Sequence, residues 1–561
     1  MTRLLLLAAS SALLLSLGLP NEVFKYGFPP LGFVALAPLW VALTEVDGYG
    51  RAALLTGLFG ALQHALSSYW LYFFKDFAFW TLGSTTIAYG IVYAVFGLYL
   101  GFFARRGGWG RPVAFAALWA IFEFLKSNGF LGYPWGLIPY TLTRTLPLLQ
   151  IADVTGVYGI SAVLAFVNAT LAEFCLQLPR SFGGEGGSRG VVPGSAPGPK
   201  AASGSALGST GGQAAPAPSG SLLPAYGVFS LLLLAALAFY GYVRMALPVP
   251  ELGRFTAVIT QQDVDPWNTG DLTALEANIR LSASAMDRSP GEKPDIILFS
   301  ESTLGAPYKA GHAYYSIQPA GSPFIPFIRH TGAYFFAGGP DVLSWEPLRA
   351  MNSVMLIDPE GNLVASYGKI HPVPFAEAIP FWEYAPFRNF MQRVVGLDSG
   401  WVMGTDYTIF SLPSSGGRFT FGAPICFEDA FASVCRQFML HGADLLINLT
   451  NDSWSTTESA EIQHWAAARF RSIEFRTTLL RSTNGGLSCV VGPYGEIHDA
   501  LPLFQPAAEI VSVPVYRSPS PTVYERYGDW FPRALLLLST LWAIILVAED
   551  FGFSFTRRRR P

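Results

Sequence analysis

The sequence contains few charged residues and few cysteines. Only 13% of its 561 residues are Asp, Glu, Lys or Arg, about half the share found in ordinary soluble enzymes. The 36 Lys and Arg nearly balance the 39 Asp and Glu, and no long basic stretch carries interleaved aromatics, so we expect no nucleic-acid partner. Four cysteines at uneven spacings, without a CxxC motif, make neither a disulfide framework nor a zinc site. His371 and His464 lack a second ligand at a recognised metal spacing, which favours packing or hydrogen bonding, and we expect neither a metal nor a cofactor.

Apolar residues are in excess: they make up 51% of the chain. Crossing a bilayer takes about 20 helical residues. Apolar runs of about that length lie near 4–20, 29–46, 52–73, 84–104, 112–127, 157–179, 222–246 and 531–549. We therefore predict about eight spans, seven in a membrane region 1–247 and the last in a C-terminal segment 531–561. The first run can also be read as a signal peptide, but it has no clear cleavage site, which favours a retained span.

The distribution of Lys and Arg predicts the orientation of these spans. Cytoplasmic loops are rich in Lys and Arg, and Arg557 to Arg560 directly follow the last apolar run. With eight spans, the N-terminus is then also cytoplasmic, and the long segment 248–530 lies outside the cytoplasmic membrane.

Residues 181–220 consist almost entirely of Gly, Ser, Ala and Pro. Such a composition offers too little apolar surface to offset the entropy of ordering. We expect a disordered cytoplasmic linker there, with a docking site as the alternative.

The segment 248–530 has a different pattern. Short strand-like runs such as FTAVITQQ, DIILFSEST, NSVMLIDPEG and ADLLINLTNDSW alternate with polar or helical stretches. Several runs are continuously apolar, as expected for strands covered on both faces. At about 280 residues, the segment is large enough for one substantial α/β core.

Three of these runs end in reactive side chains: Glu301 after DIILFS, Lys369 in ASYGKIHPVPFAE and Cys426 in FGAPICFED. Active sites of α/β folds lie at strand ends. Taken singly, the three residues are weak indicators, because a lone Cys is usually a small buried apolar residue and isolated Glu or Lys residues are usually solvated. Together they supply a nucleophile, a base and a cation. A free Cys has a pKa near 8.5 and needs a base such as Glu301, and Lys369 is suited to stabilise an oxyanion.

The order and contexts of these residues resemble the nitrilase superfamily over about 255–515. The matching contexts are SES around Glu301, YGKxHxVPFxE around Lys369 and PICFE around Cys426. NDSW, QHWAAARFRSIE and LLRSTNGG, together with the membrane spans, resemble the apolipoprotein N-acyltransferase branch, as do YGFPPLGFVALAPLW, SSYWLYF and GYPWGLIPY in the N-terminal half. The resemblance implies a polytopic helical membrane domain plus an extracytoplasmic nitrilase-like αββα sandwich over 248–530.

The resemblance also implies a two-step reaction at the bacterial cytoplasmic (inner) membrane, with the catalytic domain on its periplasmic side. Cys426 takes an acyl group from a phospholipid donor, and the α-amine of a diacylglyceryl-cysteine lipoprotein then attacks the thioester. One alternative is a membrane-tethered amidohydrolase, with the same triad and water as acceptor. A second is a non-enzymatic membrane scaffold or transporter with a degenerate domain.

Further residues match the family. Glu377 and Glu428 are expected to orient Lys369 or relay protons, or else to accept structural hydrogen bonds. Trp267, in DVDPWN, resembles a family tryptophan on the lipid-facing side of the site; the alternative is an interfacial anchor. Phe427 stands where the branch commonly has Tyr, which removes any role for a hydroxyl group there.

Overall fold

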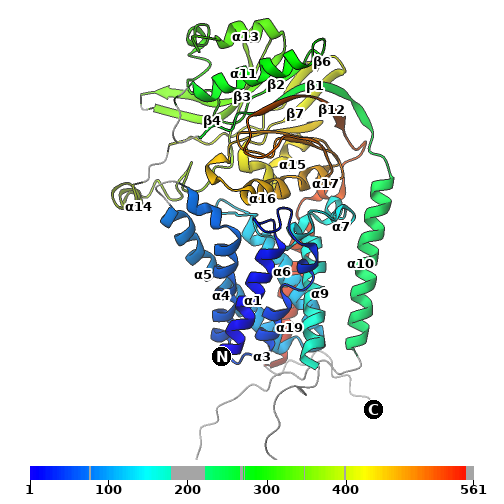
Figure 1. Cartoon of the computed structure of the whole chain (residues 1–561). Helices are drawn as coiled ribbons and strands as arrows, with labels where there is room; N and C mark the ends of the chain where they lie inside the picture. The colour runs from blue at the N-terminus through cyan, green and yellow to red at the C-terminus, as the bar shows by residue number, and fades with distance from the viewer. Residues whose placement is uncertain are drawn as a thin grey trace, which may run out of the picture.

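The computed structural model describes residues 1–74, 78–177, 222–265, 270, 272–346, 348–396 and 400–550. A bundle of helices lies beneath a two-sheet α/β domain (Figure 1). The expected linker 181–220, Trp267 and the basic segment Arg557 to Arg560 lie outside the described residues.

The apolar runs of the sequence form helices. They are α1 (Thr2–Gly18), α2 (Pro29–Gly32), α3 (Ala37–Glu45), α4 (Tyr49–Ser67), α5 (Ser84–Arg106), α6 (Arg111–Ser127), α7 (Leu146–Leu149), α8 (Ala152–Thr155), α9 (Val157–Gln177), α10 (Leu223–Ala246) and α19 (Trp530–Asp550). The run near 29–46 is divided into α2 and α3. Pro38 lies in the first turn of α3, where a proline is tolerated, whereas inside a continuous helix it would remove a hydrogen bond.

The helices of the bundle differ in length and in hydropathy. Among the described residues, four helices are both long enough and apolar enough to cross a membrane: Phe79–Arg106, Val157–Gln177, Leu223–Ala246 and Trp530–Glu549. The apolar helices Thr2–Gly18 and Pro29–Glu45 are shorter. These shorter helices pack inside the bundle, with Ala12, Leu39 and Trp40 fully buried.

Two six-stranded sheets form the core of the α/β domain. The first has the order β12-β1-β2-β3-β4-β5 and the second β11-β10-β9-β8-β7-β6. The strands are β1 (Glu251–Gln261), β2 (Ile296–Leu298), β3 (Tyr334–Trp345), β4 (Leu348–Ile357), β5 (Leu363–Gly368), β6 (Phe410–Ser414), β7 (Gly417–Gly422), β8 (Leu445–Thr450), β9 (Leu479–Thr483), β10 (Cys489–Val491), β11 (Ile497–Ala500) and β12 (Ala507–Tyr516). The central strands β1, β2 and β3 are parallel, as are β7, β8 and β9. Strands β2, β8 and β9 are buried throughout, which explains their continuous apolar runs.

Helices cover both outer faces of the paired sheets (Figure 1). The helices of this domain are α11 (Thr273–Arg288), α12 (His312–Tyr315), α13 (Phe324–Thr331), α14 (Ala385–Phe390), α15 (Ala432–Leu440), α16 (Glu458–Ala468), α17 (Phe470–Phe475) and α18 (Val523–Tyr527). Of these, α14 lies to one side of the sheets (Figure 1). Short 3-10 or π turns are η1 (Tyr69–Phe73), η3 (Phe79–Gly83), η4 (Gly108–Gly110), η5 (Ile138–Leu142), η6 (Met391–Val395), η7 (Cys426–Ala430) and η8 (Ser453–Ser455). Helices α11 and α13 lie on the side away from the bundle, and α15, α16 and α17 lie between the second sheet and the bundle (Figure 1). The predicted fold class, a helical region joined to an αββα sandwich, is confirmed.

Polar side chains of α16 and of the segment after it join the two parts. The Gln463 amide donates to the carbonyls of Pro20, at 2.8 Å, and Ser67, at 2.9 Å. The guanidinium of Arg476 contacts the Asp153 carboxylate at 2.8 Å, with both side chains buried. Buried charges persist only where they are paired, so the α/β domain is fixed to the bundle at defined points.

Candidate active site

Glu301, Lys369 and Cys426 converge at strand ends. Glu301 follows β2 and Lys369 directly follows β5 in the first sheet, and Cys426 follows β7 in the second. Lys369 Nζ lies 3.4 Å from Glu301 Oε1, and both charges lie close enough to Cys426 to shift the pKa of its thiol. All three side chains are buried, with exposed fractions of 5%, 2% and 7%. The structure thus brings together the three residues proposed from the sequence.

A sharp turn presents the Cys426 thiol. Its φ is +51°, in the left-handed region, and η7 begins at this residue. For a residue with a Cβ this conformation costs roughly 1–3 kcal/mol and persists only where neighbours enforce it. The side-chain amide of Asn448, in β8, donates to the carbonyls of Pro424 and Cys426, each at 2.9 Å. These two hydrogen bonds from Asn448 therefore fix the turn at Cys426 to β8 of the second sheet.

Lys369 lies within a small network with two carboxylates and one amide. Its Nζ donates to Glu377 Oε1 at 2.9 Å and to Glu301 Oε1 at 3.4 Å. Asn352 Nδ2, from β4, donates to the same two oxygens at 2.8 Å each. The two carboxylates are thus bridged by a cation and an amide. Asn352 carries no sequence signal beyond being a polar residue in an apolar strand.

Glu428 connects the nucleophile turn to the lysine loop. Its carboxylate accepts the backbone N–H groups of Ile425 at 2.8 Å, Ile370 at 2.9 Å and His371 at 2.8 Å. Burial raises the pKa of Glu428 to about 7, although these N–H donors oppose the shift. Because Ile370 follows Lys369 and Ile425 precedes Cys426, this one side chain fixes the spacing between cation and nucleophile.

Burial sets the charge states of the triad. It raises the pKa of Glu301, and Glu377 adds to the shift while Lys369 opposes it. It also raises the pKa of the Cys426 thiol, as does the Glu301 carboxylate. Burial alone would lower the pKa of Lys369, but Glu377 and Glu301 raise it well above its usual value. The resting site therefore holds a neutral thiol beside a carboxylate of enhanced basicity and a fixed cation.

A second series of charged side chains, linked by hydrogen bonds and an ion pair, also reaches Cys426. Asp452 Oδ1 lies 3.8 Å from Cys426 Sγ, and Asp452 Oδ2 hydrogen-bonds His464 Nδ1. His464 Nε2 lies 2.7 Å from Asp429 Oδ1, and Asp429 pairs with Arg481. Sequence reasoning expects His464 to pack or hydrogen-bond, and it hydrogen-bonds two carboxylates. Asp452 is not predicted from the sequence as a site residue, although it lies in the motif NDSW, which resembles the family.

Aromatic side chains of the helical region line the thiol side of the site. Trp135 stacks on Phe427 with ring centroids 6.2 Å apart and lies 5.5 Å from the His464 ring. Trp454 lies 5.7 Å from the ring of Trp70, in η1. Phe427 also lies beneath Lys369, whose Nζ is 5.6 Å from its ring centroid. The phenyl ring therefore packs between cation and bundle without any need for a hydroxyl group.

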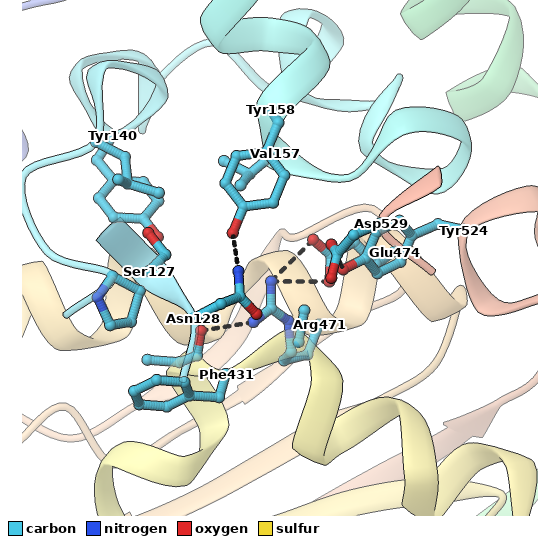
Figure 2. A pocket seen from close by; sticks show the side chains of 14 residues that line it. Ser127, Asn128, Tyr140, Val157, Tyr158, Phe431, Arg471, Glu474, Tyr524 and Asp529 are labelled. Atoms are coloured by element: carbon cyan, nitrogen blue, oxygen red, sulfur yellow. Dashed lines mark hydrogen bonds and ion pairs between the residues drawn. The ribbon is translucent and has the colours of Figure 1, made fainter. Parts of the chain in front are cut away.

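A buried pocket beneath η7 is shared by the bundle and the α/β domain (Figure 2). Asn128 Nδ2 donates to the Tyr158 hydroxyl at 3.3 Å on the bundle side. On the other side, Arg471 donates to the carbonyl of Ala430, the last residue of η7, at 2.7 Å and to Glu474 at 2.8 Å. Arg471 thus supports the far end of the turn that begins at Cys426.

Comparisons with known proteins agree with this arrangement. The model of the apolipoprotein N-acyltransferase N-terminal domain matches residues 11–170, and that of the carbon-nitrogen hydrolase domain matches 329–514. The second range includes Lys369 and Cys426.

Three relatives match along nearly their whole length. Apolipoprotein N-acyltransferase 2 of Treponema denticola is 37% identical over 94% of this chain and 94% of the relative. Apolipoprotein N-acyltransferase 2 of Treponema pallidum is 35% identical over 98% and 95%, and apolipoprotein N-acyltransferase of Borreliella burgdorferi is 30% identical over 96% and 94%. With its apolar helices and its nitrilase-like domain, the chain is a membrane protein that belongs to the apolipoprotein N-acyltransferase family, whose reaction is acyl transfer to lipoproteins.

Proposed function

We propose that Cys426 carries the acyl group, as a thioester, from a membrane phospholipid to the α-amine of an N-terminal diacylglyceryl-cysteine. The observation that carries this proposal is the meeting of a thiol, a basic carboxylate and a fixed cation in one buried site. Acyl transfer through a thioester needs these three groups within contact distance.

In the first half-reaction, Glu301 takes the Cys426 proton as the sulfur attacks the ester carbonyl carbon of the phospholipid. The Lys369 ammonium group faces the developing oxyanion, where a fixed cation in a poorly hydrated site stabilises the transition state. The ester C–O bond breaks, and the departing lysophospholipid oxygen takes the proton from Glu301. The enzyme is left as a thioester with an ionised Glu301.

In the second half-reaction, the amine nitrogen of the lipoprotein attacks the thioester carbonyl carbon, and the C–S bond breaks. Water must be kept away for this step to produce an amide instead of a free fatty acid. The burial of Cys426 and the aromatic rings of Trp135 and Phe427 beside it support that requirement. We assign Glu377 and Glu428 the positioning of Lys369, because both contact the lysine or its loop. Trp267 stays a prediction.

We further propose a multi-pass topology, with the catalytic domain on the periplasmic side of the bacterial cytoplasmic membrane. Support comes from the excess of Lys and Arg in alternate loops and from the tail Arg557 to Arg560. The rows of exposed apolar side chains along α10 and α19 suit contact with lipid. Confinement of both amphiphilic substrates to the same membrane raises their local concentration at the site.

One experiment tests the proposed reaction. Purified enzyme is incubated with phospholipid and a diacylated lipopeptide, and products are identified by mass. We expect the triacylated peptide, and with phospholipid alone an acyl adduct on Cys426 that neutral hydroxylamine releases. Cys426→Ala should abolish both, whereas Cys435→Ala and Cys489→Ala, which remove buried cysteines elsewhere, should retain the adduct. Free fatty acid without acylated peptide would instead identify a hydrolase.

A further inference from the structure

The thiol of Cys426 lies between two carboxylates, and the reaction described above uses only one of them. The thiol donates to Asp452 Oδ1 at 3.8 Å, and the nearby Glu301 carboxylate raises the pKa of the thiol. The loop that carries Asp452 also contacts Glu301, because the Asn451 N–H donates to Glu301 Oε2 at 3.1 Å. The two carboxylates therefore approach Cys426 from two different loops, after β2 and after β8, which hydrogen-bond to each other.

The surroundings of the two carboxylates shift their pKa values in opposite directions. Burial raises the pKa of Glu301. Burial would also raise the pKa of Asp452, but His464 and Arg481 lower it below its usual value. His464 is kept protonated, since Asp452 and Asp429 raise its pKa to about 9 against the effect of burial. Two carboxyl groups whose pKa values are pushed apart are suited to different tasks. Glu301 is able to exchange protons, whereas Asp452 stays ionised.

An ionised Asp452 hinders the first half-reaction. Its charge adds to the effects of burial and Glu301 that raise the pKa of the Cys426 thiol, and it likewise raises the pKa of the buried Glu461. The charge of Asp452 therefore makes the thiol harder to ionise and does not help to activate it. Once the thioester has formed, there is no thiol left to ionise, and the charge of Asp452 is then free to attract a cation.

The loop around Asp452 is rigidly held. Asn484 Nδ2 donates to Asn451 Oδ1 at 2.9 Å and to Ser453 Oγ at 2.5 Å, on either side of Asp452. One oxygen of Asp452 is engaged by His464 and the other faces the sulfur, with 13% of the side chain exposed. Oδ1, which accepts from the Cys426 thiol, is thus held in place for another hydrogen-bond donor once the sulfur is acylated and has lost its proton.

We propose that Asp452, hydrogen-bonded to His464 and facing Cys426, binds the α-ammonium group of the acceptor and presents its nitrogen to the Cys426 thioester. This inference rests on the proposed role of Cys426. The ammonium group binds with three N–H bonds and transfers one proton to Glu301, which the first half-reaction leaves ionised. The neutral nitrogen, still hydrogen-bonded to Asp452, attacks the carbonyl carbon, and the sulfur leaves as a thiolate. The second proton passes to that thiolate, and Glu301 later releases its proton to water.

The two half-reactions separate this role from a merely structural one. Enzyme is acylated with a labelled phospholipid, freed of donor and mixed with a diacylated lipopeptide. For Asp452→Asn we expect acylation at the wild-type rate or faster, because a charge beside the thiol is removed. We expect kcat/KM for the lipopeptide to fall roughly 10- to 100-fold, the size of one hydrogen bond to a charged group. Asp452→Glu, which keeps the charge, should recover part of the loss.

The matched control is Asp444→Asn, because Asp444 contacts Thr420 at the opposite end of β8 from Asp452 and should change neither step. Equal slowing of both half-reactions in Asp452→Asn, or unchanged transfer, would overturn the inference. Absence of the thioester in the wild-type enzyme would instead overturn the role of Cys426.

A measurement on the wild-type enzyme keeps the inference testable if the variants fold poorly. A lipopeptide with an N,N-dimethylated α-amine is cationic but cannot form the amide, and its N-acetylated counterpart is neutral. We expect the dimethylated peptide to inhibit transfer from the thioester at concentrations where the acetylated peptide does not. Equal inhibition by the two would show that the charge is not recognised.

Discussion

Removing the side-chain amide of Asn352 tests whether Glu301 acts as the base. Asn352 donates to Glu301 and to Glu377 at 2.8 Å each, so it stabilises the ionised form of Glu301 and separates two like charges. Burial and Glu377 already raise the pKa of Glu301, and the Asn352 hydrogen bond opposes them. In Asn352→Ala that opposition is lost, and the pKa of Glu301 rises further.

The size of the effect follows from the lost hydrogen bond. A hydrogen bond to a charged group contributes about 1.5–3 kcal/mol, and one pKa unit corresponds to about 1.4 kcal/mol. Acyl-enzyme formation falls at low pH, where Glu301 is protonated. The acid limb of its pH profile should therefore move upward by about 1 to 2 pH units in Asn352→Ala. The plateau should change less, because Lys369 still contacts both carboxylates.

Single-turnover acylation of Cys426, followed from low to high pH, measures this shift. Asn362→Ala is the matched control, since Asn362 is an exposed asparagine that contacts Asp358. An acid limb that stays in place, or moves to lower pH, would refute the assignment of Glu301 as the base, whatever happens to the plateau rate.

Three further outcomes are expected. Arg471→Met should lower stability in detergent by about 3–5 kcal/mol, because it leaves a buried carboxylate unpaired, whereas Arg254→Met at an exposed ion pair should cost at most about 1 kcal/mol; equal thermal unfolding shifts would contradict this. Excision of 185–218 should leave activity nearly intact, because its composition offers little to bury and linkers tolerate changes in length; lost activity in a normally inserted protein would show that the segment binds something. Reporter fusions near residue 400 and at the C-terminus should report opposite sides of the membrane, and a cytoplasmic signal from the first would refute the topology.

The fold class and the residues Glu301, Lys369 and Cys426 could be predicted from the sequence. Buried parallel strands require continuous apolar runs, so β2, β8 and β9 were recognisable. Glu301, Lys369 and Cys426 interrupt or follow such runs, where a polar group needs a reason to be present. The helical region was less predictable, because several helices are too short to meet the length criterion and only the packed bundle explains them.

Asn352 and Asp452 show what the sequence leaves open. Asn352 lies within β4, and its contact with Glu301 depends on the pairing of β4 with the lysine strand and with β3. Asp452 reaches Cys426 because β8 lies beside β7 and because Asn484 holds its loop. Neither contact has a fixed sequence spacing. A pattern along one chain segment cannot report which two loops meet in space.

The polar contacts between α16 and the bundle have a consequence for how the chain is made. The acceptors for Gln463, Arg469 and Arg476 lie between residues 20 and 153. Synthesis runs from the N-terminus and domains form in that order, so these acceptors are in place before their donors leave the ribosome. The early helices therefore act as a folding platform for the catalytic domain, and α19, which packs against α6, completes the assembly last. A catalytic domain produced without the early helices would leave the polar groups of Gln463, Arg469 and Arg476 without these partners.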